Sequence, residues 1–375
     1  QSYQVALNLV FADKKAQVRV IAYDLSEPDV VSRLERLGSR LKIIIDDSSD
    51  HGEAGSGETQ SEQRLSVSAG AVNVKRQHMS QLQHNKTIVV DGPKVKAAVC
   101  GSTNYSWRGF FVQANNAVVL RGRSAVKPFL AAFDDYWNNE TRSTFANTAS
   151  AAWTDLSLDG INAKVAFSPH SKTNALLQSI ADDIGTKTTS CLFYSLAFLY
   201  QTPGVMLDAI KKVSEDSKTF VYGISDRKVG GIDLQKPDGN ISPVFPAALK
   251  KNLPEPFKSE PAGGSGIRMH HKFLVVDFNK PTARVYLGSY NFSIPADTKN
   301  GENLLLIRNR RIAVSYMIEA LRLVDHYHFR VAQQEAKTAK TKLQLSKPPR
   351  LPGEEPWWTK YYSEALRIRE RELFA

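Results

Sequence analysis

One pattern of polar residues occurs twice in this chain. In each copy a histidine is followed by a lysine two residues later, by an aspartate five residues after the lysine, and then by the sequence Gly-Ser-x-Asn-x-Ser. The first copy contains His84, Lys86, Asp91, Ser102 and Asn104, and the second contains His270, Lys272, Asp277, Ser289 and Asn291. The two histidines are 186 residues apart and the two Gly-Ser pairs 187 residues apart. A single short motif is a weak signal, but two compound motifs in register indicate an internal duplication.

The types and spacing of these residues suit chemistry on a phosphate group. Alternate residues of a β-strand point to the same face, so we expect each histidine to lie beside the lysine of its own motif. A lysine ammonium is a compact positive charge that can pair with a non-bridging phosphate oxygen. Neutral donors for the same oxygens are expected from Ser102, Asn104, Asn115, Ser289 and Asn291. Two such half-sites facing each other would hold one phosphodiester between two imidazoles.

Two imidazoles on opposite sides of a phosphodiester favour a double displacement. One imidazole attacks phosphorus and forms a covalent phosphohistidine, while the other protonates the leaving oxygen and then activates water or an alcohol. The predicted substrate is therefore an anionic phosphodiester. No cluster of cysteine and histidine has the spacing of a zinc site, so no metal is expected.

The paired motifs resemble those of the phospholipase D superfamily, whose members carry two such His-Lys-Asp motifs in one active site. The resemblance covers roughly residues 18–330, because the segments around the motifs also repeat. It implies catalysis through phosphohistidine without metal or cofactor, and a nucleophile in the N-terminal motif, although inactive members exist. An amide in the first half and a carboxylate in the second also resemble the tyrosyl-DNA phosphodiesterases. That likeness is partial, because those enzymes lack the motif aspartate.

One difference between the copies predicts the role of each histidine. Glu302 in the second copy stands where the first copy has Asn115. If Glu302 binds His270, as the equivalent carboxylate of the resembled family does, its charge raises the pKa of His270 and makes it the general acid. Asn115 would bind His84 without adding charge, which leaves His84 neutral and nucleophilic. The predicted catalytic residues are His84, His270, Lys86, Lys272, Asp91, Asp277 and Glu302. Within this set the two aspartates are expected to hold strand geometry rather than to react.

The remaining histidines and the cysteines are weaker signals. His271 lies inside the second motif but should face the other side of its strand. We expect surface or packing roles for His51, His78, His170, His326 and His328. Cys100 and Cys191 both lie in apolar runs and are predicted to be buried thiols.

Strands and helices alternate through both copies, which indicates an α/β fold built twice. We expect two similar domains, each a mixed β-sheet flanked by helices, related by a pseudo-twofold axis as in the phospholipase D fold. The predicted domains are residues 1–150, residues 151–335, and a C-terminal segment, 336–375, with a basic linker and an aromatic amphipathic helix.

Three stretches and the C-terminal helix have less certain roles. Residues 46–70 are polar and rich in glycine and serine, and are predicted to form a mobile loop, with a short helix at its end as the alternative. Residues 141–157 are interpreted as the linker, and the proline-rich residues 230–266 as a loop that selects the substrate. The C-terminal helix, residues 357–373, is expected to pack on the body through its aromatic residues Trp357, Trp358, Tyr361 and Tyr362, with peripheral membrane contact as the alternative.

The composition limits the partners more than the compartment. A net charge of +11 and a pI near 9.4 indicate affinity for an anion, and nucleic acid and anionic lipid headgroups satisfy this equally well. A solvated basic surface without a partner stays open as well. No apolar run approaches the roughly 20 residues that span a bilayer. The chain begins with Gln1, so a secreted protein whose signal peptide has been removed is one interpretation, and the compartment is not determined. A monomer is expected, because both half-sites lie in one chain.

Two functions share the predicted chemistry. The first hypothesis is a phospholipase D that hydrolyses phospholipid or transfers phosphatidyl to an alcohol, and the alternative is a nuclease or other nucleic-acid phosphodiesterase. A lipase should have an apolar slot beside the histidines, whereas a nuclease should have basic residues that follow a backbone. A non-enzymatic anion-binding protein would need an incomplete site, and the motifs are complete apart from the change of glutamate to asparagine.

Overall fold

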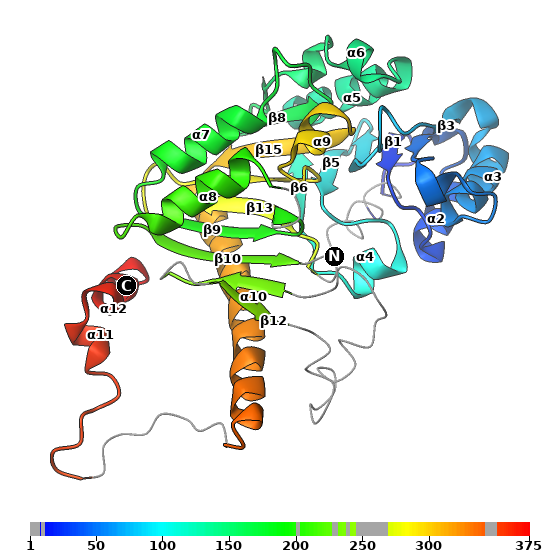
Figure 1. Cartoon of the computed structure of the whole chain (residues 1–375). Helices are drawn as coiled ribbons and strands as arrows, with labels where there is room; N and C mark the ends of the chain where they lie inside the picture. The colour runs from blue at the N-terminus through cyan, green and yellow to red at the C-terminus, as the bar shows by residue number, and fades with distance from the viewer. Residues whose placement is uncertain are drawn as a thin grey trace.

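The computed structural model describes residue 8 and residues 12–199, 203–226, 232–237, 241–244, 269–341 and 351–375. The strands belong to two mixed sheets, one formed before residue 150 and one after it (Figure 1).

The first sheet has six strands in the order β3-β2-β1-β4-β5-β6. They are β1 (Gln17–Ala22), β2 (Leu41–Ile45), β3 (Val74–Arg76), β4 (Lys86–Asp91), β5 (Lys96–Gly101) and β6 (Ala117–Arg121). The first three strands are parallel, and β4 pairs with β1 and β5 in antiparallel fashion. Strand β4 is an almost unbroken run of buried residues, as expected of a central strand covered on both faces.

The second sheet repeats this arrangement and extends it at both edges. Its strands are β7 (Thr154–Asp155), β8 (Asn162–Ser168), β9 (Cys191–Leu196), β10 (Phe220–Asp226), β11 (Ile232–Gln235), β12 (Ile241–Val244), β13 (Lys272–Val276), β14 (Arg284–Gly288) and β15 (Glu302–Arg308), in the order β12-β11-β10-β9-β13-β14-β15-β8-β7. Strand β13 pairs with β9 and β14 as β4 pairs with β1 and β5. The register is also repeated, since Lys86 lies opposite Ala22 and Lys272 opposite Leu196.

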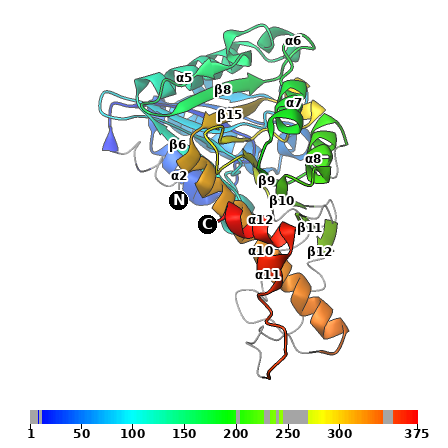
Figure 2. The same cartoon turned by 90° about the vertical axis from the view of Figure 1, so that its left-hand side faces the viewer.

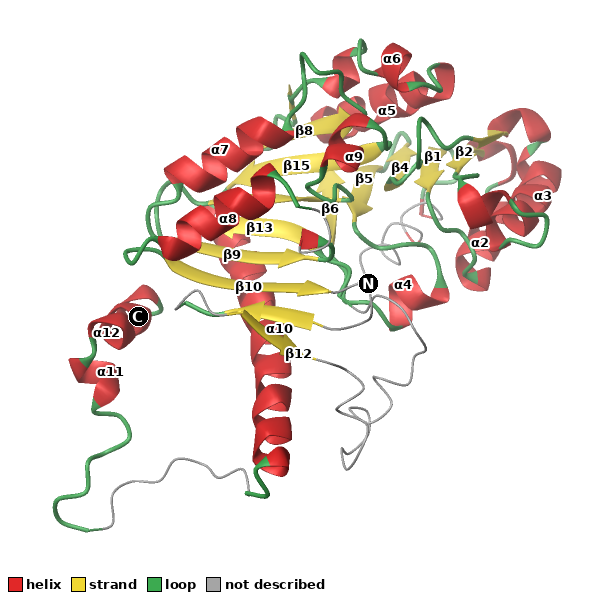
Figure 3. Ribbon diagram, viewed as in Figure 1, coloured by secondary structure: helices red, strands yellow, loops and turns green. Residues whose placement is uncertain are grey.

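Helices cover the faces of both sheets (Figure 3). On the first sheet, α2 (Pro28–Glu35) and α3 (Gly57–Ala69) share a core cluster with β1, β2 and β4. On the second, α7 (Leu177–Lys187) and α8 (Val205–Glu215) share a cluster with β9 and β13. The longer helices α5 (Arg123–Asn138) and α10 (Arg310–Thr338) belong to a third cluster, which contains residues of both sheets. This shared core holds the two halves together, for example through the edge-to-face contact of Phe129 with Phe167.

Short helices and turns complete the described chain. They are η1 (Gly38–Arg40), η2 (Ser49–Gly52), η3 (Ala71–Asn73), α4 (Trp107–Phe111), α6 (Arg142–Phe145), η4 (Ala149–Ala151), α9 (Ile294–Thr298), α11 (Lys360–Ser363) and α12 (Ala365–Leu373). Helices α4 and α9 occupy equivalent places, because each begins after the last serine of its Gly-Ser-x-Asn-x-Ser motif. Ser106 and Ser293 cap them by accepting hydrogen bonds from the backbone N–H groups of Gly109 and Ala296.

Two of the three expectations about irregular segments need correction. The predicted mobile loop 46–70 contains the 13-residue helix α3, capped by Ser56 and anchored by the buried residues Leu65 and Ala69. Its polar composition concealed the helix, because only a narrow stripe of α3 is apolar. The predicted linker 141–157 packs tightly, since Phe145 stacks on Tyr136 with ring centroids 4.1 Å apart. Part of the predicted loop 230–266 forms strand β11 and the edge strand β12, and most of the remainder lies outside the described residues.

Other expectations agree with the structure. Cys100 and Cys191 are buried free thiols, as predicted. The two similar α/β domains with mixed sheets flanked by helices are also confirmed. Within the part of the chain that the structure describes, none of the helices has both the length and the apolar character needed to cross a bilayer.

The C-terminal segment returns to the body near β10 (Figure 2). Phe374 contacts the rings of Phe193, Phe220 and Phe278, with centroids 5.6 to 6.2 Å apart. A cavity of about 660 Å³ lies between this segment and β10, lined in part by Trp357. The predicted single helix is split into α11 and α12, and it contacts the body through Phe374. Three of the aromatic residues that were expected to pack remain 38 to 62% exposed, namely Trp357, Trp358 and Tyr362.

Candidate active site between the two domains

The two motif histidines meet where the domains face each other. His84 and His270 immediately precede the motif strands β4 and β13, and Lys86 and Lys272 are the first residues of those strands. All four side chains are almost completely buried, with 5% or less of each residue exposed. The second motif contacts the first half directly, since the backbone N–H of His270 donates to the carbonyl oxygen of Ala114 at 2.9 Å.

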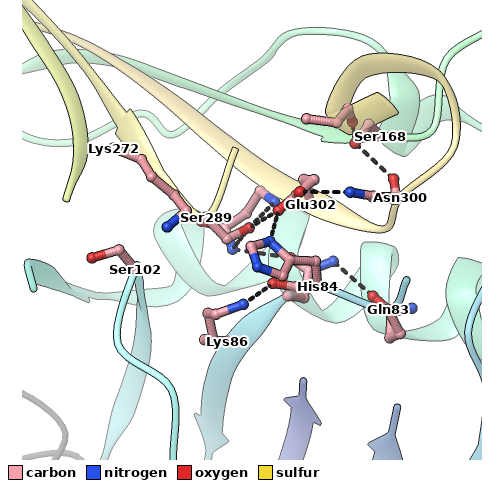
Figure 4. Close-up of polar contacts among 12 residues, drawn as sticks. Gln83, His84, Lys86, Ser102, Ser168, Lys272, Ser289, Asn300 and Glu302 are labelled. Carbon is pink, nitrogen blue, oxygen red and sulfur yellow. Dashed lines mark hydrogen bonds and ion pairs between the residues drawn. The ribbon is translucent and has the colours of Figure 1, made fainter. Parts of the chain in front are cut away.

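His84 is held by a carboxylate from the other domain (Figure 4). Its Nδ1 donates to Oε2 of Glu302 at 2.8 Å. The same oxygen accepts a hydrogen bond from the hydroxyl of Ser289 at 2.7 Å, and Oε1 accepts one from the amide of Asn300 at 3.3 Å. Three donors therefore converge on Glu302, and they orient its carboxylate toward His84.

His270 is held in the same way by an amide from the first domain. Its Nδ1 donates to Oδ1 of Asn115 at 2.9 Å and lies 3.0 Å from the carbonyl oxygen of Ser102. The hydroxyl of Ser102 donates to Oδ1 of Asn115 at 2.9 Å, which matches the role of Ser289 in the other half. The amide nitrogen of Asn115 in turn donates to the carbonyl oxygen of Gly109 at 2.9 Å.

The partners predicted for the two histidines are therefore wrong. From the two copies of the motif, Glu302 was expected to bind His270 and Asn115 to bind His84. In the structure each side chain binds the histidine of the opposite domain. The physical reason is the symmetry of the interface. Asn115 and Glu302 lie at or just before the strand that follows each Gly-Ser motif, and this part of each domain faces the motif histidine of the other.

Burial and the two lysines determine the charges of the imidazoles. The pKa of His84 lies well below its ordinary value, because burial disfavours the imidazolium and Lys86 and Lys272 repel it. The pKa of His270 is lowered well below its ordinary value by burial and by the same lysines. The expectation that the pKa of His270 is raised is thus wrong for the free protein, because burial and the lysines favour the neutral form of both imidazoles.

The lysines and Glu302 are perturbed by the same environment. Burial lowers the pKa of Lys86 to about 7, and it lowers the pKa of Lys272 well below its ordinary value, with Lys86 contributing further repulsion. Burial also raises the pKa of Glu302 to about 7 against the attraction of Lys86. Glu302 is the carboxylate that attracts both lysines, so a bound phosphate anion would favour the charged form of each.

The serine and asparagine side chains expected to bind phosphate divide into two groups. Ser102 and Ser289 are fully buried, and their hydroxyls bind Asn115 and Glu302, so they position those acceptors. Asn104 and Asn291 each have a buried Oδ1 without a hydrogen-bond partner. The structure therefore places Ser102, Ser289 and Asn115 behind the histidines.

The glycine before each of these serines is required by close packing. Gly288 has a φ of 147°, and a Cβ there would lie 2.2 Å from the carbonyl oxygen of Asn303. Gly101 is in the equivalent position, with a φ of 158° and the carbonyl oxygen of Asn116 at the same distance. A side chain at either position would push the strand away and displace the acceptor beside it.

The motif aspartates lie away from the histidines. Each comes five residues after its lysine, which corresponds to roughly 16 Å along a strand. Asp277 is fully buried and accepts hydrogen bonds from the backbone N–H groups of Thr189, Ser190 and Cys191 at 2.8 to 3.2 Å. Asp91 is partly exposed and pairs with Lys96. Both hold neighbouring strands, as expected, and neither belongs among residues that touch the substrate.

Two aromatic residues beside the lysines were not predicted. The ring of Tyr23 lies edge-on to His84 with centroids 4.6 Å apart, and the ammonium of Lys86 lies 4.5 Å from the same ring. Phe198 stands beside His270 and Lys272 at 6.4 and 5.6 Å. Both residues follow the strand next to the motif strand. Nothing in their type or spacing distinguishes them in the sequence, because the contact depends on sheet pairing.

Four further histidines lie within ion-pair distance of a carboxylate among the described residues, namely His51, His78, His170 and His271. His51 binds Asp46 at 2.9 Å, and its ring contacts Tyr23. His170 is buried and binds Asp297 at 2.8 Å. Both fit the predicted packing role. No group of three His, Cys, Asp or Glu side chains among the described residues is arranged as metal ligands would be.

Solved structures with a similar fold cover most of this chain. The phosphatidylserine synthase of Haemophilus influenzae Rd KW20 superposes with a TM-score of 0.58 over 86% of this chain and 84% of that one, at 15% identity. The polyphosphate kinase of Porphyromonas gingivalis superposes with a TM-score of 0.51 over 85% of this chain and 45% of that one, at 9% identity. At these identities the likeness is one of fold.

Sequence similarity to individual proteins is local. The phospholipase D of Rickettsia prowazekii (strain Madrid E) is 42% identical over 48 residues, which is 13% of this chain and 22% of the relative. The chain thus spans about a fifth of the length of the curated relatives it matches.

The family match, by contrast, extends over more than half of the chain. The family model described as "Cardiolipin synthase, PLD-like domain" matches residues 11–137 and again residues 196–323, and each match includes one histidine–lysine motif. The duplicated motif, the paired sheets and this double match agree with one another. The chain therefore belongs to this PLD-like family, within the phospholipase D superfamily of phosphodiesterases and transferases.

Proposed function

We propose that this protein is a phospholipid phosphodiesterase, which hydrolyses a phospholipid or transfers its phosphatidyl group to an alcohol through a covalent phosphohistidine. The observation that carries the proposal is the exchange of partners across the domain interface. Each motif histidine is held at Nδ1 by the other domain, so Nε2 is the nitrogen left to each ring for the substrate.

His84 is the nucleophile in this proposal. Glu302 accepts a hydrogen bond from the N–H group at Nδ1 of His84, so the lone pair of the neutral ring is on Nε2. Nε2 forms a bond to phosphorus as the bond from phosphorus to the leaving oxygen breaks, and Nε2 of His270 gives its proton to that oxygen. Glu302 then stabilises the positive charge that develops on the phosphohistidine ring. The pairing thus supports the predicted role of His84 for a different reason from the one that the sequence suggested.

The second step reverses the roles of proton donor and acceptor. His270, now neutral, takes a proton from water or an alcohol, whose oxygen attacks phosphorus while the bond from phosphorus to His84 breaks. Asn115 keeps the proton of His270 on Nδ1 throughout, so that Nε2 is the nitrogen that exchanges it. His84 leaves as a neutral imidazole, and the enzyme is restored.

The substrate itself sets the charge that His270 needs. In the free protein the lysines lower the pKa of His270, but a bound phosphodiester anion neutralises part of their charge. Binding therefore raises the pKa of Lys86, Lys272 and His270 together. The imidazolium that acts as general acid then forms in the complex with substrate.

Two observations support a lipid as the substrate. The local sequence match is to proteins named phospholipase D, and the fold neighbour of nearly equal extent is named phosphatidylserine synthase. The aromatic rings of Tyr23 and Phe198 beside the lysines also give the site apolar walls. We propose further that the chain acts as a monomer, because both histidines and both of their partners come from one chain.

Nucleic acid is the second candidate, and the net charge of +11 is the observation that favours it. The two substrates share the chemistry and differ in what surrounds the phosphate. A direct comparison of both substrates with one protein preparation therefore distinguishes them.

The test is incubation of the protein with phosphatidylcholine vesicles and ethanol, and separately with single-stranded DNA. Formation of phosphatidylethanol by the wild type, its loss in His84→Ala, and its retention in His78→Ala are expected. His78 is a matched control, because it is an exposed histidine of the same domain that pairs only with Asp47. Cleaved DNA with intact lipid would overturn the lipid proposal in favour of the nuclease.

A further inference from the structure

Helix α4 presents aromatic side chains to solvent beside the active site. Trp107 is 56% exposed and Phe111 is 69% exposed. Their rings lie 6.3 Å apart, and Phe110 between them in sequence packs inward against the core of the first domain. The helix lies at the periphery of the molecule (Figure 1). Two large adjacent aromatic residues exposed on a five-residue helix are an unusual use of apolar surface.

The same helix is connected to His270 by two hydrogen bonds. The carbonyl oxygen of Gly109, in the middle of α4, accepts a hydrogen bond from the amide nitrogen of Asn115 at 2.9 Å. Oδ1 of Asn115 accepts the proton of His270 Nδ1 at 2.9 Å. Gly109 is two residues from both Trp107 and Phe111. A shift of α4 therefore acts directly on the side chain that orients His270.

Helix α4 is also packed closely against the first Gly-Ser-x-Asn-x-Ser motif. A Cβ on Gly109 would lie 2.2 Å from the carbonyl oxygen of Asn104. The equivalent helix α9 is connected to its acceptor by a different route, since the backbone N–H of Asn300 donates to the carbonyl oxygen of Pro295 and its side-chain amide donates to Glu302. Its residue Ala296, which matches Gly109, has a carbonyl oxygen that accepts from Ser168, whereas Glu302 is held by Ser289 and Asn300. Helix α9 contains no aromatic residue, so of these two helices only α4 presents aromatic side chains, and it lies in the half that orients His270.

We propose that Trp107 and Phe111 dock α4 on the surface of a phospholipid bilayer, and that this contact fixes Asn115 and so activates His270. The inference rests on the proposed lipid function. A bilayer is the chosen occupant because Trp is favoured at the boundary between headgroups and acyl chains. The charge of the protein agrees, since Arg108 lies between the two aromatic residues and the chain is strongly basic.

Docking is tested without turnover of lipid. Vesicles of digalactosyldiacylglycerol with a minor fraction of sulfoquinovosyldiacylglycerol form a negatively charged bilayer that contains no phosphate. Co-sedimentation should show binding of the wild type. The affinity of the double variant Trp107→Ala/Phe111→Ala for the vesicles should be lower by a factor of about 10 or more. The matched control is Val67→Ala/Val72→Ala, which removes two apolar side chains that are 89% and 84% exposed in the same domain. Thermal unfolding of each variant checks that the fold is retained.

Activation is tested with a soluble substrate, bis(4-nitrophenyl) phosphate. Without vesicles the wild type and the Trp107/Phe111 variant should hydrolyse it at the same rate. If docking holds α4 more firmly, the same phosphate-free vesicles should raise kcat of the wild type by roughly threefold or more. They should leave kcat of the variant unchanged. A role of the aromatic residues in folding alone would not produce this difference.

Several outcomes would overturn the inference. Equal vesicle binding by the wild type and the Trp107/Phe111 variant would exclude α4 as the docking surface, and binding without a change in kcat would exclude the coupling to His270. Loss of single-stranded DNA binding in the variant, in place of vesicle binding, would assign the patch to nucleic acid. Loss of concentration-dependent dimerisation would assign it to a second copy of the chain. If vesicles bind and activate hydrolysis of the soluble phosphodiester but no phospholipid is turned over, the proposed substrate fails while docking stands.

Discussion

Replacement of Glu302 by glutamine is the most informative perturbation of the site. Glutamine has nearly the same shape as glutamate and can still accept the proton of His84 Nδ1, so the variant removes mainly the negative charge. That charge faces His84 across a hydrogen bond of 2.8 Å in a fully buried environment. When the ring of His84 becomes a phosphohistidine, its positive charge lies about 4 Å from the carboxylate. At an effective dielectric constant of about 20 the attraction is roughly 4 kcal/mol.

An energy of this size predicts a large loss of rate. Each 1.36 kcal/mol corresponds to about a tenfold change, so Glu302→Gln should lower kcat about 10³-fold. The assay is hydrolysis of bis(4-nitrophenyl) phosphate in the steady state, together with rapid quenching and mass spectrometry of the covalent adduct. In the wild type the adduct should be found on His84, and its formation should be the step that slows in the variant.

The pH profile gives a second measure of the same interaction. Burial raises the pKa of Glu302 to about 7, so the carboxylate takes up a proton and loses its charge as the pH falls below that value. The kcat/KM of the wild type, which reports the free enzyme, should decrease on the acid side of about pH 7. The glutamine of Glu302→Gln has no charge to lose in this pH range, so kcat/KM of the variant should not show this decrease at acid pH.

Exchange of the two partners tests whether the acceptor determines the role. In the double variant Asn115→Asp/Glu302→Gln the carboxylate lies behind His270 instead of His84. We expect the adduct to move to His270 and part of the lost activity to return. The reasoning would be refuted if kcat of Glu302→Gln were within about tenfold of the wild-type value. It would also be refuted if the His84→Ala variant still formed the covalent adduct.

Three further predictions follow from the same contacts. Asn115→Leu removes the acceptor of His270 Nδ1, so kcat should fall roughly 10²-fold, and quench-flow should show accumulation of the adduct on His84 because its hydrolysis needs His270 as base. Burial lowers the pKa of Lys86 to about 7, so near pH 8 the binding of tungstate, an anion shaped like phosphate, should take up a proton and should weaken as the pH rises, by up to ~10-fold per pH unit. Calorimetry in two buffers of different ionisation enthalpy measures the proton uptake, and its absence in the wild type would contradict the prediction. Asp277→Ala leaves the buried N–H donors of the neighbouring strand without an acceptor and should cost about 3 kcal/mol of unfolding free energy in urea titrations, with kcat unchanged; a large fall in kcat with normal stability would place Asp277 in the chemistry after all.

The sequence by itself determined the duplicated motif, the two α/β domains and the delivery of each histidine beside its lysine. These features are local, because the side chains of a strand alternate with a period of two and an apolar run forms the strand wherever it lies. The roles of Asp91 and Asp277 in holding strands followed from the same spacing. Residues 46–70 were misjudged for a local reason too, because a polar helix with a narrow apolar stripe resembles a loop in composition.

Only the tertiary structure decided which acceptor serves which histidine. Glu302 and His84 are 218 positions apart, and His270 and Asn115 are 155 apart, so their pairing depends on how the domains face each other. The pKa values of the histidines and lysines likewise depend on burial at that interface, which no local pattern contains. The contact of Tyr23 with His84 and Lys86, and the connection of α4 to His270 through Asn115, have the same origin, since the packing of segments distant in sequence creates them.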